Sequence, residues 1–186
     1  MNLTQKVIKA WLPLAAAITL ISGVFYVAIQ QTLRLGANEP QVQMAKDAAQ
    51  ALANGESAES LLTEHTIDVA SSLAPYLAVY DANGKALASN ARLHGNPPEL
   101  PAGVFDYTRQ RGEDRISWQP EPGVRSAVVI VPVSGGQGGY VLAGRSLRET
   151  EARIELLNLQ VGFGLVATLI GTLVVVGIVE WLPWLR

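Results

Sequence analysis

The sequence predicts an α+β protein in which two transmembrane helices flank one domain that contains both helices and strands. Residues 10–29 and 161–179 carry no charged side chain and are mostly apolar. At about 1.5 Å per residue, each stretch is long enough as a helix to cross the roughly 30 Å hydrocarbon core of a bilayer. Between them, apolar residues recur first with the period of a helix and then with the alternation of strands. The expected order of parts is therefore helix, mixed domain, helix.

The composition excludes several classes of protein. The 186 residues include no cysteine, which rules out a disulfide scaffold, a thiolate metal site and a cysteine nucleophile. The formal net charge is −2, so the chain lacks the basic surface that nucleic-acid binding requires, and we expect no nucleic-acid partner. Charged residues make up only 16% of the chain, which is low for a soluble domain and favours a lipid bilayer as the partner of the apolar segments.

The first apolar stretch is expected to remain in the mature protein as a membrane helix, residues 10–30. A cleaved signal peptide is the alternative, because Lys6 and Lys9 precede an apolar run. The run is longer than a usual signal-peptide core, however, and residues 30–34 show no small-residue cleavage pattern. The two lysines place the N-terminus, residues 1–9, in the cytoplasm. Trp11 is expected at the level of the lipid headgroups.

The second membrane helix, residues 158–182, is then expected to return the chain to the cytoplasm. Trp181 and Trp184 suit the headgroup level at its end. Residues 183–186 form a cytoplasmic stub, and residues 31–157 form the domain outside the cytoplasm. Because so few residues remain inside, we expect any output to pass through the helices or through a separate partner protein.

The domain is expected to begin with helices. Residues 38–40, Asn-Glu-Pro, have the pattern of a helix N-terminus, with proline where its missing N–H is not needed. Residues 54–55, Asn-Gly, would end that helix. A second helical stretch is predicted from residue 57 to residue 73, before Pro75 breaks it.

Strands are expected after Pro75, where the apolar period changes to two. The Asn-Gly pair in the turn 81–84 predicts a hairpin of residues 76–80 and 85–89. An excursion without regular structure follows over residues 90–106. Three more strands are predicted, with the second as the central strand of the sheet: residues 114–119, 124–133 and 140–146.

The glycine-rich residues 135–139 are interpreted as a hairpin loop. A phosphate-binding loop would need a lysine followed by serine or threonine and then a helix, whereas Tyr140 begins a strand here. From Leu147 the pattern becomes helical and continues into the second membrane helix, with Arg148, Glu149, Glu151 and Arg153 expected on its water-exposed side.

This order of parts, with the hairpin Leu-Ala-Val-Tyr-Asp-Ala-Asn-Gly-Lys-Ala-Leu-Ala-Ser over residues 77–89, resembles the extracytoplasmic PAS-like (Cache-type) sensor regions of bacterial two-pass membrane receptors. The resemblance implies a five-stranded antiparallel sheet with helices against one face, a homodimer formed through the leading helix, and a small-molecule pocket above the sheet. It also implies a location in the bacterial inner membrane. Such receptors continue into a cytoplasmic output module, which this chain lacks, so the chain could be a truncated receptor.

Few residues are suited to catalysis. His65 and His94 are both interpreted as exposed surface residues, since neither has converging metal ligands or a partner for acid–base chemistry. We therefore expect no enzyme activity, no metal and no cofactor. If a pocket exists, a small anionic ligand could be held by one guanidinium and an aromatic wall, formed by Tyr107, Trp118, Arg125 and Tyr140. The alternative is that the aromatic side chains fill the core and Arg125 faces water.

The two membrane helices carry small residues at spacings that allow close approach of another helix. The other helix of the same chain or a partner could occupy this face, which consists of Ala15, Thr19, Gly23, Gly164, Ala167, Thr168 and Gly171.

Three functions are open. The first is a sensor that binds a ligand outside and signals through its helices to a membrane or cytoplasmic partner. The second is an assembly or regulatory subunit whose domain only docks another protein. An exported enzyme is the third, and the least expected.

Overall fold

The structure, a computed structural model, describes residues 2–36, 38–135 and 138–185. The chain divides into two units. One unit, residues 1–33 with 152–186, holds the apolar parts of the two long helices, and the other, residues 34–151, is an α+β domain.

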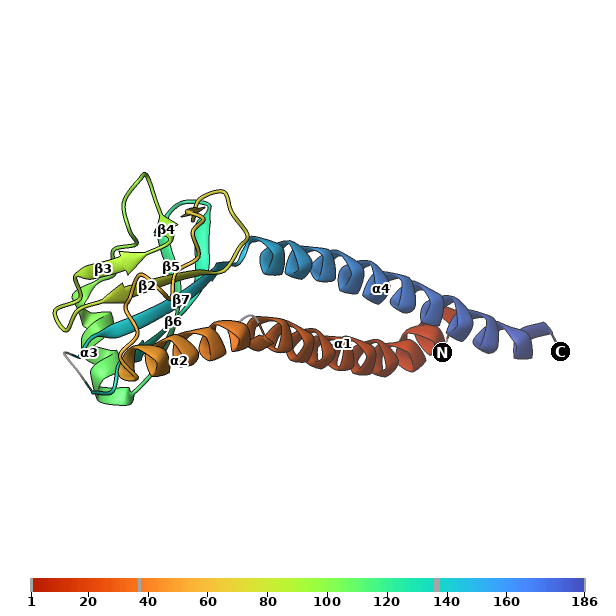
Figure 1. The fold of residues 1–186 in the computed structure, drawn as a ribbon. Helices are drawn as coiled ribbons and strands as arrows, with labels where there is room; N and C mark the ends of the chain where they lie inside the picture. The colour runs from red at the N-terminus through yellow and green to blue at the C-terminus, as the bar shows by residue number, and fades with distance from the viewer. Residues whose placement is uncertain (1, 37, 136–137, 186) are drawn as a thin grey trace. The chain divides into compact units, whose positions relative to one another are not determined.

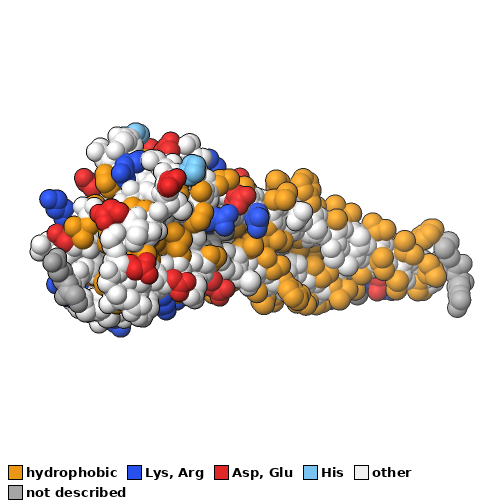
Figure 2. All heavy atoms as spheres, viewed as in Figure 1, with side chains coloured by type: hydrophobic (Ala, Val, Ile, Leu, Met, Phe, Trp, Pro, Cys, Tyr) orange, Lys and Arg blue, Asp and Glu red, His pale blue; other side chains and the backbone are white. Residues whose placement is uncertain are grey.

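Two long apolar helices form the first unit. Helix α1 spans Leu3–Gly36, and helix α4 spans Arg148–Trp181 and ends in a short 3₁₀ helix, Leu182–Leu185. Their most apolar 18-residue windows have mean hydropathies of 2.1 and 2.4, so both helices are long and apolar enough to span a membrane. Apolar side chains gather over these helices, whereas charged side chains lie over the domain (Figure 2).

The domain is built on a five-stranded antiparallel sheet with the strand order β3-β2-β7-β6-β5 (Figure 1). This confirms the α+β class and the antiparallel five-stranded sheet. The strands are β2 (Tyr76–Tyr80), β3 (Ala86–Ser89), β5 (Asp114–Glu121), β6 (Val124–Pro132) and β7 (Tyr140–Ser146). Strand β6 lies inside the sheet, but the expectation that it is the central strand was wrong: β7 lies in the middle.

Helix α2, Glu39–Ala53, covers one face of the sheet. Three alanines, Ala45, Ala48 and Ala49, bring its backbone close to the strands. They pack on Leu77, Val129, Val131, Val141 and Ala143. The helix ends at Asn54–Gly55, as predicted, with Gly55 at φ +96°. At its start, Asn38 precedes Pro40 as expected but makes no side-chain capping bond, because it has helical backbone angles.

The opposite face of the sheet is covered by helix α3 (Ala102–Arg111) and by a small parallel pair, β1 (Ile67–Asp68) with β4 (Ala91–Arg92). Helices therefore lie on both faces, not on one. Strand β4 and the start of α3 also lie within residues 90–106, for which no regular element was predicted. We call residues 90–101 the cover segment, since Ala91, Leu93 and Leu100 pack into the core on this face.

The helix predicted over residues 57–73 is absent; turns and β1 occupy this stretch. The side chains explain the difference. Ser57 accepts a hydrogen bond from the backbone of Ser60, and the Asp68 carboxylate accepts from the Ala70 N–H and the Ser71 hydroxyl. Such local bonds compete with those of a helix. The backbone N–H of Ile67 donates instead to the carbonyl of Asn90, at 2.7 Å.

The predicted hairpin is confirmed, and so is its turn over residues 81–84, where the Gly84 N–H donates to the Asp81 carbonyl at 3.0 Å. Asp81 Oδ1 accepts hydrogen bonds from the N–H groups of Asn83 and Lys85, and Gly84 alone of the pair 83–84 has positive φ, +81°. Strand β5 continues beyond its predicted end at residue 119 and includes Pro120. Proline is tolerated there because β5 is an edge strand. Strands β6 and β7 pair as predicted, and residues 136 and 137 of their glycine-rich connection lie outside the described residues.

Candidate functional site

The start of helix α4 is bonded to several separate parts of the domain. Strand β7 ends at Ser146, and α4 begins at Arg148, so Leu147 alone separates the middle strand of the sheet from the helix. The Leu147 N–H donates to the carbonyl of Arg125 on β6 at 2.8 Å. The first turn of α4 is thereby fixed to two neighbouring strands.

Arginine side chains tie this region to the turn formed by residues 70–73. The Arg148 guanidinium donates to the carbonyl oxygens of Ala70 and, at 3.3 Å, of Ser71. Arg145 Nε donates to the carbonyl of Leu73 at 3.3 Å. We call this group, Arg145 and Arg148 with residues 70–73, the arginine latch. It connects the β1 side of the domain to the first turn of α4.

Two ion pairs surround the arginine latch. Arg145 pairs with Glu149 at 3.3 Å, and Arg125 pairs with Glu151 at 3.0 Å. All four side chains are close to half exposed, so each pair contributes little to stability by itself. Their effect is positional, since both pairs hold the acidic first turn of α4 against strands β6 and β7.

Asp68 orders the turn that the arginines bind. Its carboxylate accepts hydrogen bonds from the Ser71 hydroxyl at 2.7 Å and from the Ala70 N–H at 3.0 Å. Both bonds favour the ionised form, the Ser71 bond more strongly, so the pKa of Asp68 is lowered from its ordinary value. The adjacent Val69 is buried in the core, and this anchors the arginine latch to the sheet.

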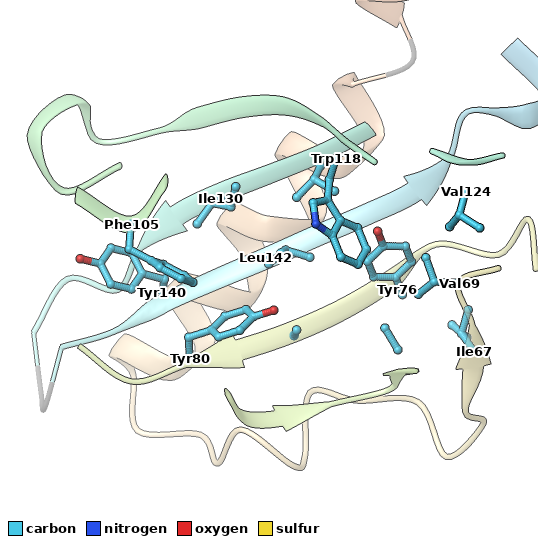
Figure 3. Close-up of a cluster of buried hydrophobic side chains, with 13 residues drawn as sticks. Ile67, Val69, Tyr76, Tyr80, Phe105, Trp118, Val124, Ile130, Tyr140 and Leu142 are labelled. Atoms are coloured by element: carbon cyan, nitrogen blue, oxygen red, sulfur yellow. The ribbon is translucent and has the colours of Figure 1, made fainter. Parts of the chain in front are cut away.

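The face of the sheet under the cover segment is rich in aromatic side chains (Figure 3). Phe105 from α3 lies between Tyr80 and Tyr140, with ring centroids 5.2 and 5.1 Å away. The Tyr80 hydroxyl donates to the carbonyl of Pro98 at 2.7 Å, and burial raises the pKa of Tyr80. The Tyr140 hydroxyl accepts from Arg109 Nε at 3.0 Å.

Two buried hydroxyl groups lie farther along this face. The Tyr76 ring crosses Gly144 of β7, where a Cβ atom would stand only 2.3 Å from Tyr76 Cζ. Its hydroxyl and that of Ser126 on β6 are both buried and lack a hydrogen-bond partner of good geometry. Burial raises the pKa of Tyr76 to about 12, and the nearby Ser126 hydroxyl opposes that rise.

The four residues expected to hold an anionic ligand lie in different places. Trp118 and Tyr140 belong to the buried cluster, whereas the Tyr107 side chain is 48% exposed and lies beneath the Arg111 guanidinium. Arg125 is engaged with Glu151. The buried aromatics and the half-exposed Arg125 match the alternative interpretation of these residues, and a shared ligand site for all four stays a prediction.

A groove of about 480 Å³ lies elsewhere, between α2 and the end of β6. Lys46, Gln50 and Ser134 supply its polar side chains. Lys46 pairs with Glu113 at 2.9 Å, which lowers the pKa of Glu113. Because Glu113 already pairs with this lysine, the groove offers no strong anion site.

Within the unit of long helices, α1 and α4 are joined by polar side chains. Trp11 Nε1 donates to the Leu169 carbonyl at 3.1 Å and to Thr172 Oγ1 at 3.2 Å. The Tyr26 hydroxyl donates to Asn158 Oδ1 at 2.8 Å. The Trp11 N–H is therefore bonded to helix α4, and its place at the headgroup level stays a prediction. The Trp184 side chain lies outside the described part of the structure.

The small residues of these helices have a different environment from Trp11. Ala15 is buried, and its carbonyl accepts from Thr19 Oγ1; Thr168 Oγ1 bonds back to the carbonyl of Gly164. A Cβ atom added at any of the three glycines, Gly23, Gly164 and Gly171, would meet nothing within 4 Å. Close packing of those glycines, and of Ala167, against another chain stays a prediction.

Sequence reasoning missed Arg145, Asp68 and the latching role of Arg148. One signal was present for Arg148: a cation in the first turn of a helix opposes the helix dipole, so an arginine there requires another partner. Asp68 lay in a stretch interpreted as helix.

No protein-family model matches the sequence, and no curated protein is significantly similar to it.

Proposed function

We propose that this chain is a non-enzymatic two-pass protein of the bacterial inner membrane, whose domain senses a stimulus outside the cytoplasm and transmits it through α4 to a separate partner protein. One observation carries the proposal. The arginine latch joins the turn beside β1 to the first turn of a helix that runs without a break from Arg148 to Trp181. A change in packing under the cover segment would therefore act on the helix that contains the second apolar segment.

The strength of such a connection is adequate for signalling. Hydrogen bonds from a charged donor contribute about 1.5–3 kcal/mol when well formed, and less at an exposed site. Allosteric coupling of 1–3 kcal/mol changes an equilibrium by roughly 5- to 150-fold. Two arginines that each bind carbonyl groups of one turn can supply the lower part of that range.

The membrane orientation is tested by labelling introduced cysteines, because the natural chain has none. A cysteine at Asn83, in the exposed turn between β2 and β3, should react with a membrane-impermeant maleimide in intact cells. A cysteine at Gln5 should react only after the cells are lysed. The opposite pattern would refute the proposed orientation, and protection of both sites until lysis would refute exposure of the domain.

Transmission is tested with Arg148→Gln and its matched control Arg153→Gln, which removes the same charge farther along α4. Spin labels at Ile8 and Ile178, both about half exposed, report the distance between α1 and α4 in lipid nanodiscs. We expect Arg148→Gln to shift or broaden the distance distribution and Arg153→Gln to leave it unchanged. No change in either variant would contradict transmission and favour a subunit that only docks another protein.

A small anionic ligand near Arg125 remains part of the proposal. Any such ligand must compete with Glu151 for the guanidinium. Short carboxylates should therefore raise the melting temperature of the full chain, following RT ln(1 + [L]/Kd), and the rise should be lost in Arg125→Gln. A rise that survives this substitution would place the ligand elsewhere. We also propose the homodimer that the family resemblance implies, and the mass of the chain in nanodiscs tests it.

A further inference from the structure

We propose that His94 and Glu121 form a proton-controlled clasp, which fastens the cover segment to the far edge of the sheet in acid and releases it as the pH rises. His94 Nε2 lies 2.8 Å from Glu121 Oε2. Glu121 is the last residue of β5, and His94 lies within the cover segment. The contact therefore joins two elements that are distant in the sequence.

The clasp lies on the edge strand β5, across the sheet from the strand where the cover segment starts. The cover segment starts beside β2, where the side chain of Asn90 accepts the backbone N–H of Leu77 at 2.8 Å. Strands β7 and β6 lie between β2 and β5 in the sheet. The cover segment therefore runs from β2 to a contact with the opposite edge strand. Leu93 packs into the core, and the Arg92 carbonyl accepts a hydrogen bond from the Val69 N–H, so loss of the contact with Glu121 would release the exposed turn that follows Leu93.

The backbone at His94 supports a role for its side chain. Leu93 and Asn96 exchange two backbone hydrogen bonds, of 2.8 and 3.0 Å, around a two-residue turn. His94 and Gly95 have φ of +51° and +83° in this turn. Glycine, asparagine and aspartate adopt these angles most easily. A histidine at the first position is strained relative to asparagine, and what it adds is the imidazole that reaches Glu121.

Charged groups around His94 determine the direction of the pH response. Glu121 faces it from β5, and Asp68 acts on it from β1. Arg92, in its own segment, is engaged with the carbonyl groups of Ser89 and Ala91. The hydrogen bond and the charge of Glu121 raise the pKa of His94 above its ordinary value of 6.5. The clasp is therefore complete below about pH 6.5 and is lost as the pH rises through the raised value.

Asp68 connects the clasp to the arginine latch. Its charge acts on His94, and its carboxylate orders the turn that Arg148 binds. Transfer of the proton signal to α4 rests on the proposed function, whereas the clasp itself does not. The two therefore fail separately: one in the distance between the cover segment and β5, the other in the distance between α1 and α4.

The test uses the full chain in nanodiscs with spin labels on cysteines that replace Asn96 and Pro122, two exposed residues beside the clasp. We expect one narrow distance distribution at pH 5.5 and a broader, longer one at pH 8.5. Its midpoint should match the pKa of His94, measured by NMR on histidine-labelled protein, and Glu121→Gln should lower that pKa. Since the chain has only two histidines, the two signals are assigned by substitution.

Three variants decide the outcome. His94→Asn keeps a residue that suits positive φ, so the turn should remain while the pH response disappears. Glu121→Gln should also abolish the response, and His65→Asn, the matched control, should retain it. An unchanged distribution between pH 5.5 and 8.5 in the unmodified clasp would overturn the proposal, as would a full pH response in Glu121→Gln.

Discussion

Replacement of Gly144 by alanine should destabilise the domain through one identified contact. The new Cβ atom would stand 2.3 Å from Cζ and 2.4 Å from Cε2 of Tyr76. Ordinary carbon–carbon contacts begin near about 3.5 Å, so the ring has to move by roughly 1 Å. Tyr76 is only 1% exposed and belongs to the packed cluster with Trp118 and Val124, which leaves the ring no free space.

The expected cost is that of overpacking a core, about 1–3 kcal/mol. For a domain of this size the melting temperature should fall by on the order of 4 °C for each kcal/mol, which gives a decrease of about 4–12 °C. Thermal unfolding of the full chain in detergent, followed by circular dichroism, measures this decrease in melting temperature. Gly103→Ala is the matched control, because a Cβ atom in helix α3 meets nothing within 4 Å there. That variant should be as stable as the natural chain or slightly more stable.

A double-mutant cycle separates the contact from other effects. Tyr76→Leu removes the ring atoms that alanine at position 144 would strike. In the Tyr76→Leu background, Gly144→Ala should leave the free energy of unfolding unchanged or raise it by about 0.5–1 kcal/mol, because glycine weakens a strand. If Gly144→Ala costs the same with and without the Tyr76 ring, the contact is not the cause and the reasoning is refuted.

Three further substitutions test other contacts. Tyr80→Phe leaves the buried Pro98 carbonyl without its donor and should lower the free energy of unfolding by about 1–3 kcal/mol in denaturant titrations, whereas Tyr107→Phe, at an exposed ring, should change it little. Trp11→Phe removes the indole hydrogen bonds to Leu169 and Thr172 and should weaken the α1–α4 pairing by about 0.6 kcal/mol, at most roughly 1.7 kcal/mol. Unfolding in mixed micelles measures this change, with Trp181→Phe as the control. Equal changes in the two variants would contradict a role for the indole hydrogen bonds. Asp68 has a lowered pKa, so its contribution to the stability of the domain is fully present above about pH 3.9 and is lost as the pH falls through the lowered value. Asp68→Asn should therefore lower the denaturation midpoint at pH 7, and the midpoints of the variant and the natural chain should converge in acid. A constant difference between the two midpoints at all pH values would exclude this linkage.

The sequence predicted the elements whose patterns are local. The apolar runs of α1, α4, β2 and β6 depend only on neighbouring residues. Strands β2 and β6 were located within one residue of their observed bounds, whereas α1 extends beyond the predicted residues 10–30 at both ends. Strands β1 and β4 were missed because each has two residues and exists only through the parallel pairing of Ile67 with Ala91 and of Asp68 with Arg92. Nothing in either segment alone indicates that pairing.

Helix α3 was missed for a related reason. Only Phe105 and Thr108 are buried among its ten residues, so it has no apolar stripe that periodicity could reveal. The arginine latch depends on backbone carbonyl groups of residues 70–73, which have no side-chain signature. The His94–Glu121 contact joins residues whose proximity follows from the course of the cover segment over the sheet.

The position of β7 determines when the domain can fold during synthesis. This strand is the last of the five along the chain, yet it lies between β2 and β6, and its Gly144 pairs with Tyr76 far upstream. Until the ribosome has made residues 140–146, β2 and β3 form only an isolated hairpin, which is marginally stable at best. The sheet therefore stays unfinished until the second apolar helix is being synthesised, and only then can the core close.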